Sequence, residues 1–261
     1  MQRRATSYAA PGRNSYPAAA VQSRQPAAAS SHEQILDQKI GDVTGDGVPD
    51  LVYLTGKKQA DSPYIQQITL HVTDGQTRQT TAVALPQNSG YHPTLQLTDV
   101  TGNRIQDILI VIDSGGSGAF IFSYVYSYLN NRPQALFDSD AYNQHHKYNV
   151  TYLDGFRVRA VSHQPQASYI IDLTYKGRDY LSEIYTSSGK LKQPIQGDVN
   201  ALSGLYPIDF DRDGQSELMA LQRITGRYNA DGLGYFMNVL KWNRDRFDVS
   251  QQWVWISGAN G

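Results

Sequence analysis

The chain has 261 residues, enough for one large domain or two small ones, and a formal net charge of −1, too nearly neutral to recruit nucleic acid or an anionic membrane. It contains no cysteine, which excludes disulfides, thiolate catalysis and cysteine-ligated zinc. Tyrosine outnumbers phenylalanine by 18 to 7, a bias typical of strands with one half-wet face. No apolar run is long enough to cross a bilayer.

Residues 1–32 are rich in Ala, Ser, Pro and Arg and contain no acidic residue. Such a segment has too few large apolar side chains to offset the entropy lost on ordering, so we expect a disordered tail. A docking arm for an acidic surface and an organellar transit peptide are the alternatives. The segment lacks the apolar stretch of a secretory signal, so we expect the protein to stay with the producing cell, either in the cytoplasm or associated with the cell or spore surface.

The body, residues 33–261, repeats a nine-residue acidic motif. It reads DVTGDGVPD at 42–50, DVTGNRIQD at 99–107 and DFDRDGQSE at 209–217. The first two copies are 57 residues apart and the last two 110, so a fourth copy is expected near position 154. An Asp-Gly turn stands there within Tyr152–Phe156, which we interpret as a degenerate repeat. A period near 55 residues is typical of propeller blades.

Short β-type runs flank each motif, and further runs follow it. Those before the motifs are Gln38–Gly41, Thr94–Thr98 and Leu205–Ile208, and those after are Leu51–Leu54, Ile108–Ile112 and Leu218–Leu221. The later runs are Ile65–Thr73, Ala82–Leu85, Ala119–Leu129, Gln134–Phe137, Tyr169–Tyr175, Leu181–Tyr185, Tyr235–Trp242 and Gln252–Ile256. Four strands per repeat predict an all-β fold, a small β-propeller of four to five blades over residues 33–261, with residues 35–40 closing the ring.

The motif places oxygen-bearing side chains at positions 1, 3, 5 and 9. Calcium takes six to eight hard oxygen ligands, and a sharply bent loop supplies them at odd positions. An EF-hand is excluded because its position 12 needs a glutamate, and the chain has Tyr53, Ile110 and Ala220 there. The alternative is a hairpin turn capped by its own aspartates, without any metal.

The three copies resemble the calcium loops of FG-GAP/VCBS repeats in integrin-α-like propellers, and the layout is similar to VCBS-repeat proteins of spore-forming bacteria. The resemblance implies bound Ca²⁺ with a structural role and no catalytic site. It assigns these ligands, with position 7 contributing its carbonyl: Asp42, Thr44, Asp46, Val48 and Asp50; Asp99, Thr101, Asn103, Ile105 and Asp107; Asp209, Asp211, Asp213, Gln215 and Glu217.

The three loops differ in charge. The third has four carboxylates, the first three and the second two, so we expect calcium affinity to fall in that order. Arg104 stands in the second loop where glycine is favoured, and a left-handed arginine costs about 1 kcal/mol. Whether the second loop binds metal is therefore left open.

If the acidic loops join the first and second strands of each repeat, the next connections lie at the opposite end. Loops gathered at one end of a rigid scaffold are where binding usually occurs. We therefore expect a ligand-binding rim containing Lys57, Lys58, Asp61, Arg227, Tyr228 and Asp231.

Together these features favour a calcium-binding, non-catalytic module that binds a protein or glycan partner through its loop rim. A polysaccharide-active enzyme and a structural protein of a cell or spore surface are the alternatives.

Overall fold

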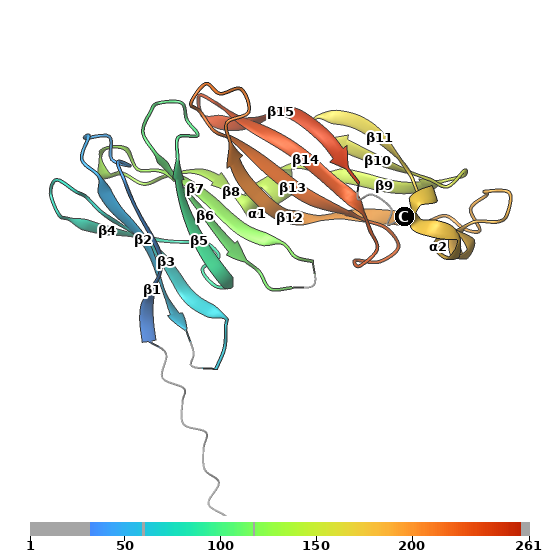
Figure 1. The fold of residues 1–261 in the computed structure, drawn as a ribbon, viewed down its shortest axis with the longest axis horizontal. Helices are drawn as coiled ribbons and strands as arrows, with labels where there is room; N and C mark the ends of the chain where they lie inside the picture. Colours follow the sequence, from blue (N-terminus) through green and yellow to red (C-terminus); the bar gives the residue numbers. More distant parts are fainter. Residues whose placement is uncertain (1–31, 59–60, 117, 257–261) are drawn as a thin grey trace, which may run out of the picture.

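The computed structural model describes residues 32–58, 61–116 and 118–256, which form three antiparallel sheets (Figure 1). The predicted tail, apart from His32, lies outside the described residues. The first sheet is a meander of four consecutive strands: β1 (His32–Gly41), β2 (Asp50–Lys58), β3 (Ile65–Thr73) and β4 (Thr80–Ala84). The first acidic loop joins β1 to β2.

The second sheet repeats this arrangement. Its strands are β5 (Tyr91–Thr98), β6 (Asp107–Asp113), β7 (Ile121–Ser127) and β8 (Gln134–Asp138), and the second acidic loop joins β5 to β6. A short 3₁₀ turn, η1 (Leu129–Asn131), lies between β7 and β8. The helix α1 (Ser139–His145) follows, capped by the Asp138 carboxylate, which accepts the backbone N–H groups of the first turn.

The third sheet has seven strands in the order β11-β10-β9-β12-β13-β14-β15. Four of them, β12 (Gln196–Ile208), β13 (Glu217–Thr225), β14 (Gly232–Asn243) and β15 (Arg246–Trp255), form another meander, with the third acidic loop between β12 and β13. The other three extend it: β9 (Tyr148–Leu153), β10 (Arg157–His163) and β11 (Gln166–Asp172). A 3₁₀ turn, η2 (Thr174–Lys176), and the helix α2 (Gly177–Ile184) connect β11 toward β12.

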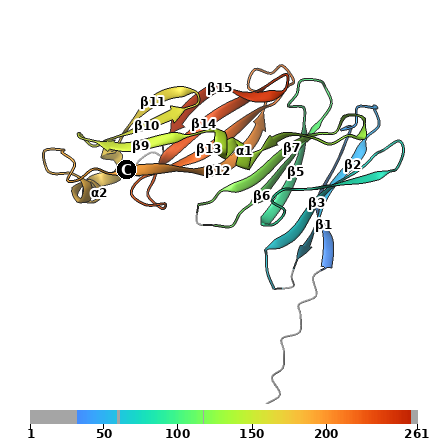
Figure 2. The ribbon, with the colours of Figure 1, turned by 180° about the vertical axis from the view of Figure 1, so that it is seen from behind.

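The sheets pack face to face. One face of the second sheet, with Tyr124, Tyr126 and Tyr128 buried, packs on the first sheet. Its other face, with Leu109 and Val125, packs on β12–β14 of the third. The alternating tyrosines of β7 are thus core residues. Viewed from behind, α1 lies where the second and third sheets meet (Figure 2), and it contacts strands of both.

The seven-stranded sheet curls until its edges approach. The Tyr169 hydroxyl on β11 donates to the Gln252 carbonyl on β15 at 3.1 Å, although these strands are at opposite ends of the strand order. Phe236, fully buried, fills the interior between the Tyr148 and Tyr169 rings. The result is a nearly closed barrel, with one part of its inner face covered by the second sheet.

The acidic loops contact one another in series at one end of the molecule. The Gln106 N–H, at motif position 8 of the second loop, donates to the Asp42 carbonyl, at position 1 of the first (3.2 Å). The Ser216 N–H, at position 8 of the third loop, donates in the same way to the Asp99 carbonyl of the second (2.7 Å). The same pair of motif positions therefore fixes each sheet against the next.

The all-β prediction is confirmed, but two details differ. The expected ring closure is absent from the described residues, because β1 pairs with β2 at the free edge of the first sheet. The expected strand at Leu181–Tyr185 falls mostly in α2, where Tyr180, Leu181 and Ile184 share one helical face toward the barrel core. Within the described ranges, no helix combines the length and apolar character needed to cross a membrane.

Candidate functional site

The three acidic loops share one local geometry. In the first, Asp42 Oδ1 accepts the Gly45 N–H at 2.7 Å and Oδ2 accepts the Gly47 N–H at 2.9 Å. Asp99 and Asp209 accept backbone N–H groups of their own loops in the same manner. The position-5 side chains of Asp46, Asn103 and Asp213 accept the position-7 N–H of Val48, Ile105 and Gln215. These are the contacts of a self-capped turn.

The carboxylate at position 9 caps the turn from inside. Asp50 is fully buried, and Oδ2 accepts the Val43 and Thr44 N–H groups at 2.9 and 3.1 Å. Its other oxygen accepts the Gly75 N–H. Both oxygens are therefore engaged with the protein backbone, which leaves Asp50 little capacity to hold a metal as well.

In the second loop, Asp107 accepts the Val100 and Thr101 N–H groups and the Thr101 hydroxyl. Burial raises the pKa of Asp107 to about 6, because the loss of hydration outweighs these hydrogen bonds. A metal ligand must be deprotonated, so this environment does not favour cation binding near or below that pH. In the first loop, by contrast, the equivalent Thr44 hydroxyl is buried and has no hydrogen-bond partner among the described residues.

Only the third loop brings carboxylates to a common centre in the described part of the chain. Oxygens of Asp209, Asp211 and Glu217 all lie within 4.8 Å of one another. The chain's own Lys241, on β14, extends into this group: its Nζ lies 2.9 Å from both Asp211 Oδ2 and Glu217 Oε1, and 3.4 Å from Asp213 Oδ2. The bonds to Asp211 and Glu217 raise the pKa of Lys241. The carboxylate oxygens could surround a cation, and the Lys241 ammonium already occupies that role.

The predicted rim residues fall into two groups on different sheets. Lys57 and Lys58 end β2, and the exposed Asp61 follows in the β2–β3 connection of the first sheet. Arg227, Tyr228 and Asp231 lie in the β13–β14 connection of the third sheet. Tyr228 is 59% exposed, whereas Asp231 is buried. The structure therefore places only the second group around one centre.

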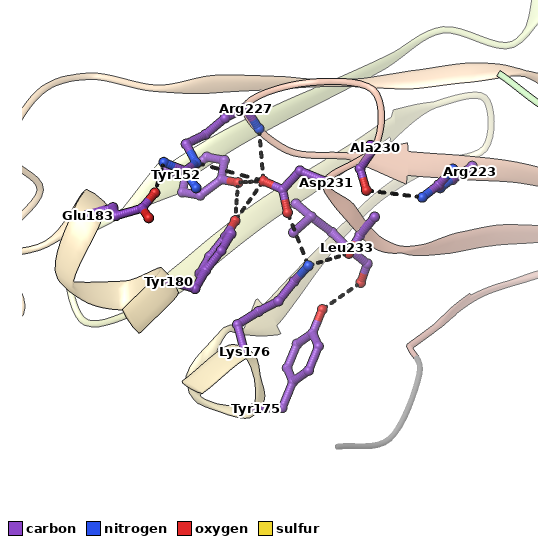
Figure 3. A network of polar contacts seen from close by, with 11 residues as sticks. Tyr152, Tyr175, Lys176, Tyr180, Glu183, Arg223, Arg227, Ala230, Asp231 and Leu233 are labelled. Carbon is purple, nitrogen blue, oxygen red and sulfur yellow. Dashed lines mark hydrogen bonds and ion pairs between the residues drawn. The ribbon is translucent and has the colours of Figure 1, made fainter. Parts of the chain in front are cut away.

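Asp231 is the centre of a polar network that joins this connection to η2 and α2 (Figure 3). Its Oδ1 accepts from Lys176 Nζ at 3.0 Å, and its Oδ2 accepts the Tyr180 hydroxyl at 2.8 Å and the Tyr152 hydroxyl at 3.2 Å. The Arg227 guanidinium pairs with Glu183 of α2 at 2.7 Å.

Burial raises the pKa of Asp231, but the hydrogen bonds from Tyr180, the Arg227 backbone and Lys176 outweigh it, so the pKa is lowered overall. Burial, together with the hydrogen bonds to Tyr152 and Asp231, raises the pKa of Tyr180. The carboxylate is thus held ionised and fully satisfied. We interpret the network as a structural contact that holds α2 against the barrel.

A pocket of about 320 Å³ lies beside this network. It is lined by Tyr175, Lys176, Arg223, Ala230 and Gly232–Tyr235. Glycine is required at one point of its wall, because a Cβ at Gly234 would lie only 2.4 Å from the Trp255 carbonyl oxygen. Arg223 makes one long bond, to the Ala230 carbonyl at 3.4 Å, and forms no ion pair with any described residue.

The outer face of β12–β15 carries apolar side chains that no second layer buries. We call it the aromatic face; it consists of Tyr206 of β12, Met219 and Leu221 of β13, Tyr235 and Met237 of β14, and Trp253 and Trp255 of β15. Tyr206, Trp253 and Trp255 are 47%, 42% and 53% exposed, and the other four are partly exposed.

Strand register places these residues in rows. Leu221, Met237 and Trp253 are direct cross-strand partners, and the next row is Arg223, Tyr235 and Trp255. The Tyr235 and Trp255 rings pack at 5.5 Å between centroids. Since Tyr235 and Arg223 also line the pocket, the aromatic face and the pocket form one continuous surface.

Sequence reasoning missed this face. The alternation of Trp253 and Trp255 in the sequence was a usable signal, because residues two apart point to the same side of a strand. Recognising it as a surface also needed the cross-strand register of four strands, which the sequence alone does not fix.

The comparisons with known proteins agree with one another. Residues 146–255, which span β9–β15, match the YybI C-terminal domain family. The chain is also 52% identical over 237 residues, covering 91% of its own length and 89% of the relative, to the "Uncharacterized protein YybI" of Bacillus subtilis (strain 168). No solved structure matches.

The chain therefore belongs to the YybI family of all-β proteins. This overturns the resemblance to FG-GAP/VCBS and integrin-α-like repeats. The motif led to the wrong family because self-capped Asp-Gly hairpins and calcium loops place the same residue types at the same positions.

Proposed function

We propose that this protein is a non-catalytic interaction module whose docking surface is the aromatic face. The observation that carries the proposal is the exposure of Tyr206, Trp253 and Trp255 on the outer side of β12–β15. Contiguous exposed apolar surface mostly marks a site of interaction, whereas single exposed apolar residues need no explanation.

The scaffold under the face is rigid. Beneath it lie the buried Leu218, Ala220, Phe236 and Leu240, so the outward side chains stand on a packed sheet. Tryptophan and tyrosine lose little conformational entropy when a partner covers them, which suits them to a preformed binding surface.

The proposal is tested with the double variant Trp253→Ser/Trp255→Ser on arrays of purified proteins and glycans. The wild-type chain should bind at least one class of ligand. The double variant should lose that binding while it keeps a cooperative thermal transition, because the buried side of the sheet is unchanged. Ile35→Ser is the matched control, since Ile35 is 58% exposed but lies on β1 of the first sheet. Binding that survives in the double variant, or no binding on either array, contradicts the proposal.

The calcium prediction stays a separate proposal. It is supported by the convergence of Asp209, Asp211 and Glu217 in the third loop and weakened by the Lys241 ammonium among them. Calcium would fix the loop of one sheet and would not act on a substrate.

A further inference from the structure

We infer that the partner of the aromatic face is a largely uncharged glycan chain in which one sugar ring carries a carboxylate, and that Arg223 binds this carboxylate at the pocket. This inference rests on the proposed function of the face. Three features of the surface select this kind of ligand. They are the area of the face, the position of its single cation, and the place where the series of contacts between acidic loops ends.

The area is small for a protein partner. An aromatic side chain buries about 150–250 Å² when fully covered, so the exposed halves of Tyr206, Trp253 and Trp255 offer roughly 300 Å². A stable protein interface takes about 800 Å² from each partner, of which about 450 Å² is apolar. Flat rings that stack one at a time on Trp253 and Trp255 use a surface of this size efficiently, because the C–H faces of pyranoses are apolar and their edges are polar.

A second copy of the chain stacked on this face would lack a contact that the other sheets make. Each successive loop donates its position-8 N–H to the position-1 carbonyl of the loop before it. A copy placed beyond the third sheet would present its first loop, where position 8 is Pro49, and proline has no N–H to donate to Asp209. The series of sheets therefore ends at the aromatic face.

Charge selects an anionic ligand. Arg223 has five N–H donors, makes one long bond to a carbonyl and has no carboxylate partner among the described residues, whereas Lys176 beside it is neutralised by Asp231. A guanidinium in this state binds a carboxylate with paired hydrogen bonds. Its place in the row with Tyr235 and Trp255 puts the anion at one end of the stacked rings.

The same distribution argues against nucleic acid. A single strand needs cations along its backbone as well as rings to stack on. Among the described residues of the face and its rows, Arg223 is the only cation, and the other members are apolar. A polymer with charge on every unit would therefore leave most of its phosphates unpaired, while a glycan keeps hydroxyl groups that water can satisfy.

The probe is a galacturonate hexamer with one free carboxylate, on a terminal ring, and methyl esters on the other five rings. It is compared by titration calorimetry with the fully methyl-esterified form, which has the same rings without charge. Wild type should bind the acid about tenfold more tightly than the ester, the usual gain from a charge-assisted hydrogen bond. Arg223→Gln should abolish this preference and retain ester binding. Trp255→Ala should weaken both about tenfold, with a matching loss of the indole fluorescence shift.

Arg104→Gln and Ile35→Ala serve as matched controls, because both side chains are exposed and belong to the second and first sheets. Equal affinity for acid and ester, no binding of either, or Arg223→Gln behaving as wild type overturns the inference. So does tighter binding of oligo-dT than of the hexamer, or sedimentation showing a dimer that Trp253→Ser/Trp255→Ser dissociates. If the array instead yields a protein ligand lost in that double variant, the proposed function stands and only the glycan inference falls.

Discussion

At the scale of single residues, the backbone at motif position 6 shows how the three loops differ. Gly47 and Gly214 have φ values of 84° and 91°, and Arg104 adopts 68° at the equivalent place. This region suits glycine, because a Cβ there meets the following carbonyl oxygen. The second loop thus keeps the conformation of its neighbours at a cost in strain.

Arg104→Gly is therefore expected to stabilise the protein. Removing the side chain from a residue in the left-handed region stabilises the folded state by about 1 kcal/mol. Glycine also has greater conformational freedom in the unfolded chain, which offsets part of this effect. The free energy of unfolding should therefore rise by about 0.5 kcal/mol. Urea denaturation measures the change. Gly47→Arg should act in the opposite direction; a lower stability for Arg104→Gly would show that the arginine side chain itself makes a favourable contact.

At the scale of elements, the meanders were the predictable part of the fold. Alternating apolar residues and turn motifs located Ile65–Thr73 to the residue, because a strand with one buried face shows its period directly. The segment of α2 was mistaken for a strand, since in a stretch this short a few apolar residues fit either period. The stacking of the sheets and the aromatic face depend on register and long-range packing, which leave no local signal.

The third acidic loop, with β14, allows a test of the calcium prediction. Lys241→Met should remove the competing ammonium, so that the carboxylates of Asp211 and Glu217 repel each other and the melting temperature falls. Added calcium should then restore it, by about 2.7 kcal/mol at a hundredfold excess over the dissociation constant. In wild type the same addition should have a smaller effect.

Thermal melting with calcium and with chelator gives the readout, and Lys190→Met, an exposed lysine with no ion pair among the described residues, is the control. If Lys241→Met does not respond to calcium, the three loops are self-capped hairpins and the metal prediction fails.

At the scale of the whole molecule, the family domain shares its core with the residues before it. Leu202, Leu205, Leu218 and Leu240 of the third sheet pack on Val125 and other residues of the second. Cutting the chain at the family boundary would expose this inner face to water, at about 25 cal/mol for each Å² of apolar surface.

The fragment 146–256 is accordingly expected to lack a cooperative thermal transition and to bind a hydrophobic dye, whereas the full chain unfolds in a single transition. Calorimetry and dye fluorescence measure both properties. Co-expression with residues 1–145 should restore the transition. A fragment that melts sharply by itself would show that the contact between the second and third sheets is dispensable.

The arrangement of the loops also polarises the molecule electrically. Asp46, Asp211 and Asp213 project at one end, and the pocket lies toward the other. Arg223 pairs with Tyr235, which is six residues of β14, or about 20 Å, from the Lys241 that contacts Asp211 and Asp213. The carboxylate of an approaching glycan is repelled by the first end and attracted to the second, so the long-range field orients the glycan before any of its rings stacks on a tryptophan. Because such steering fades with ionic strength, salt should slow association more than it hastens release.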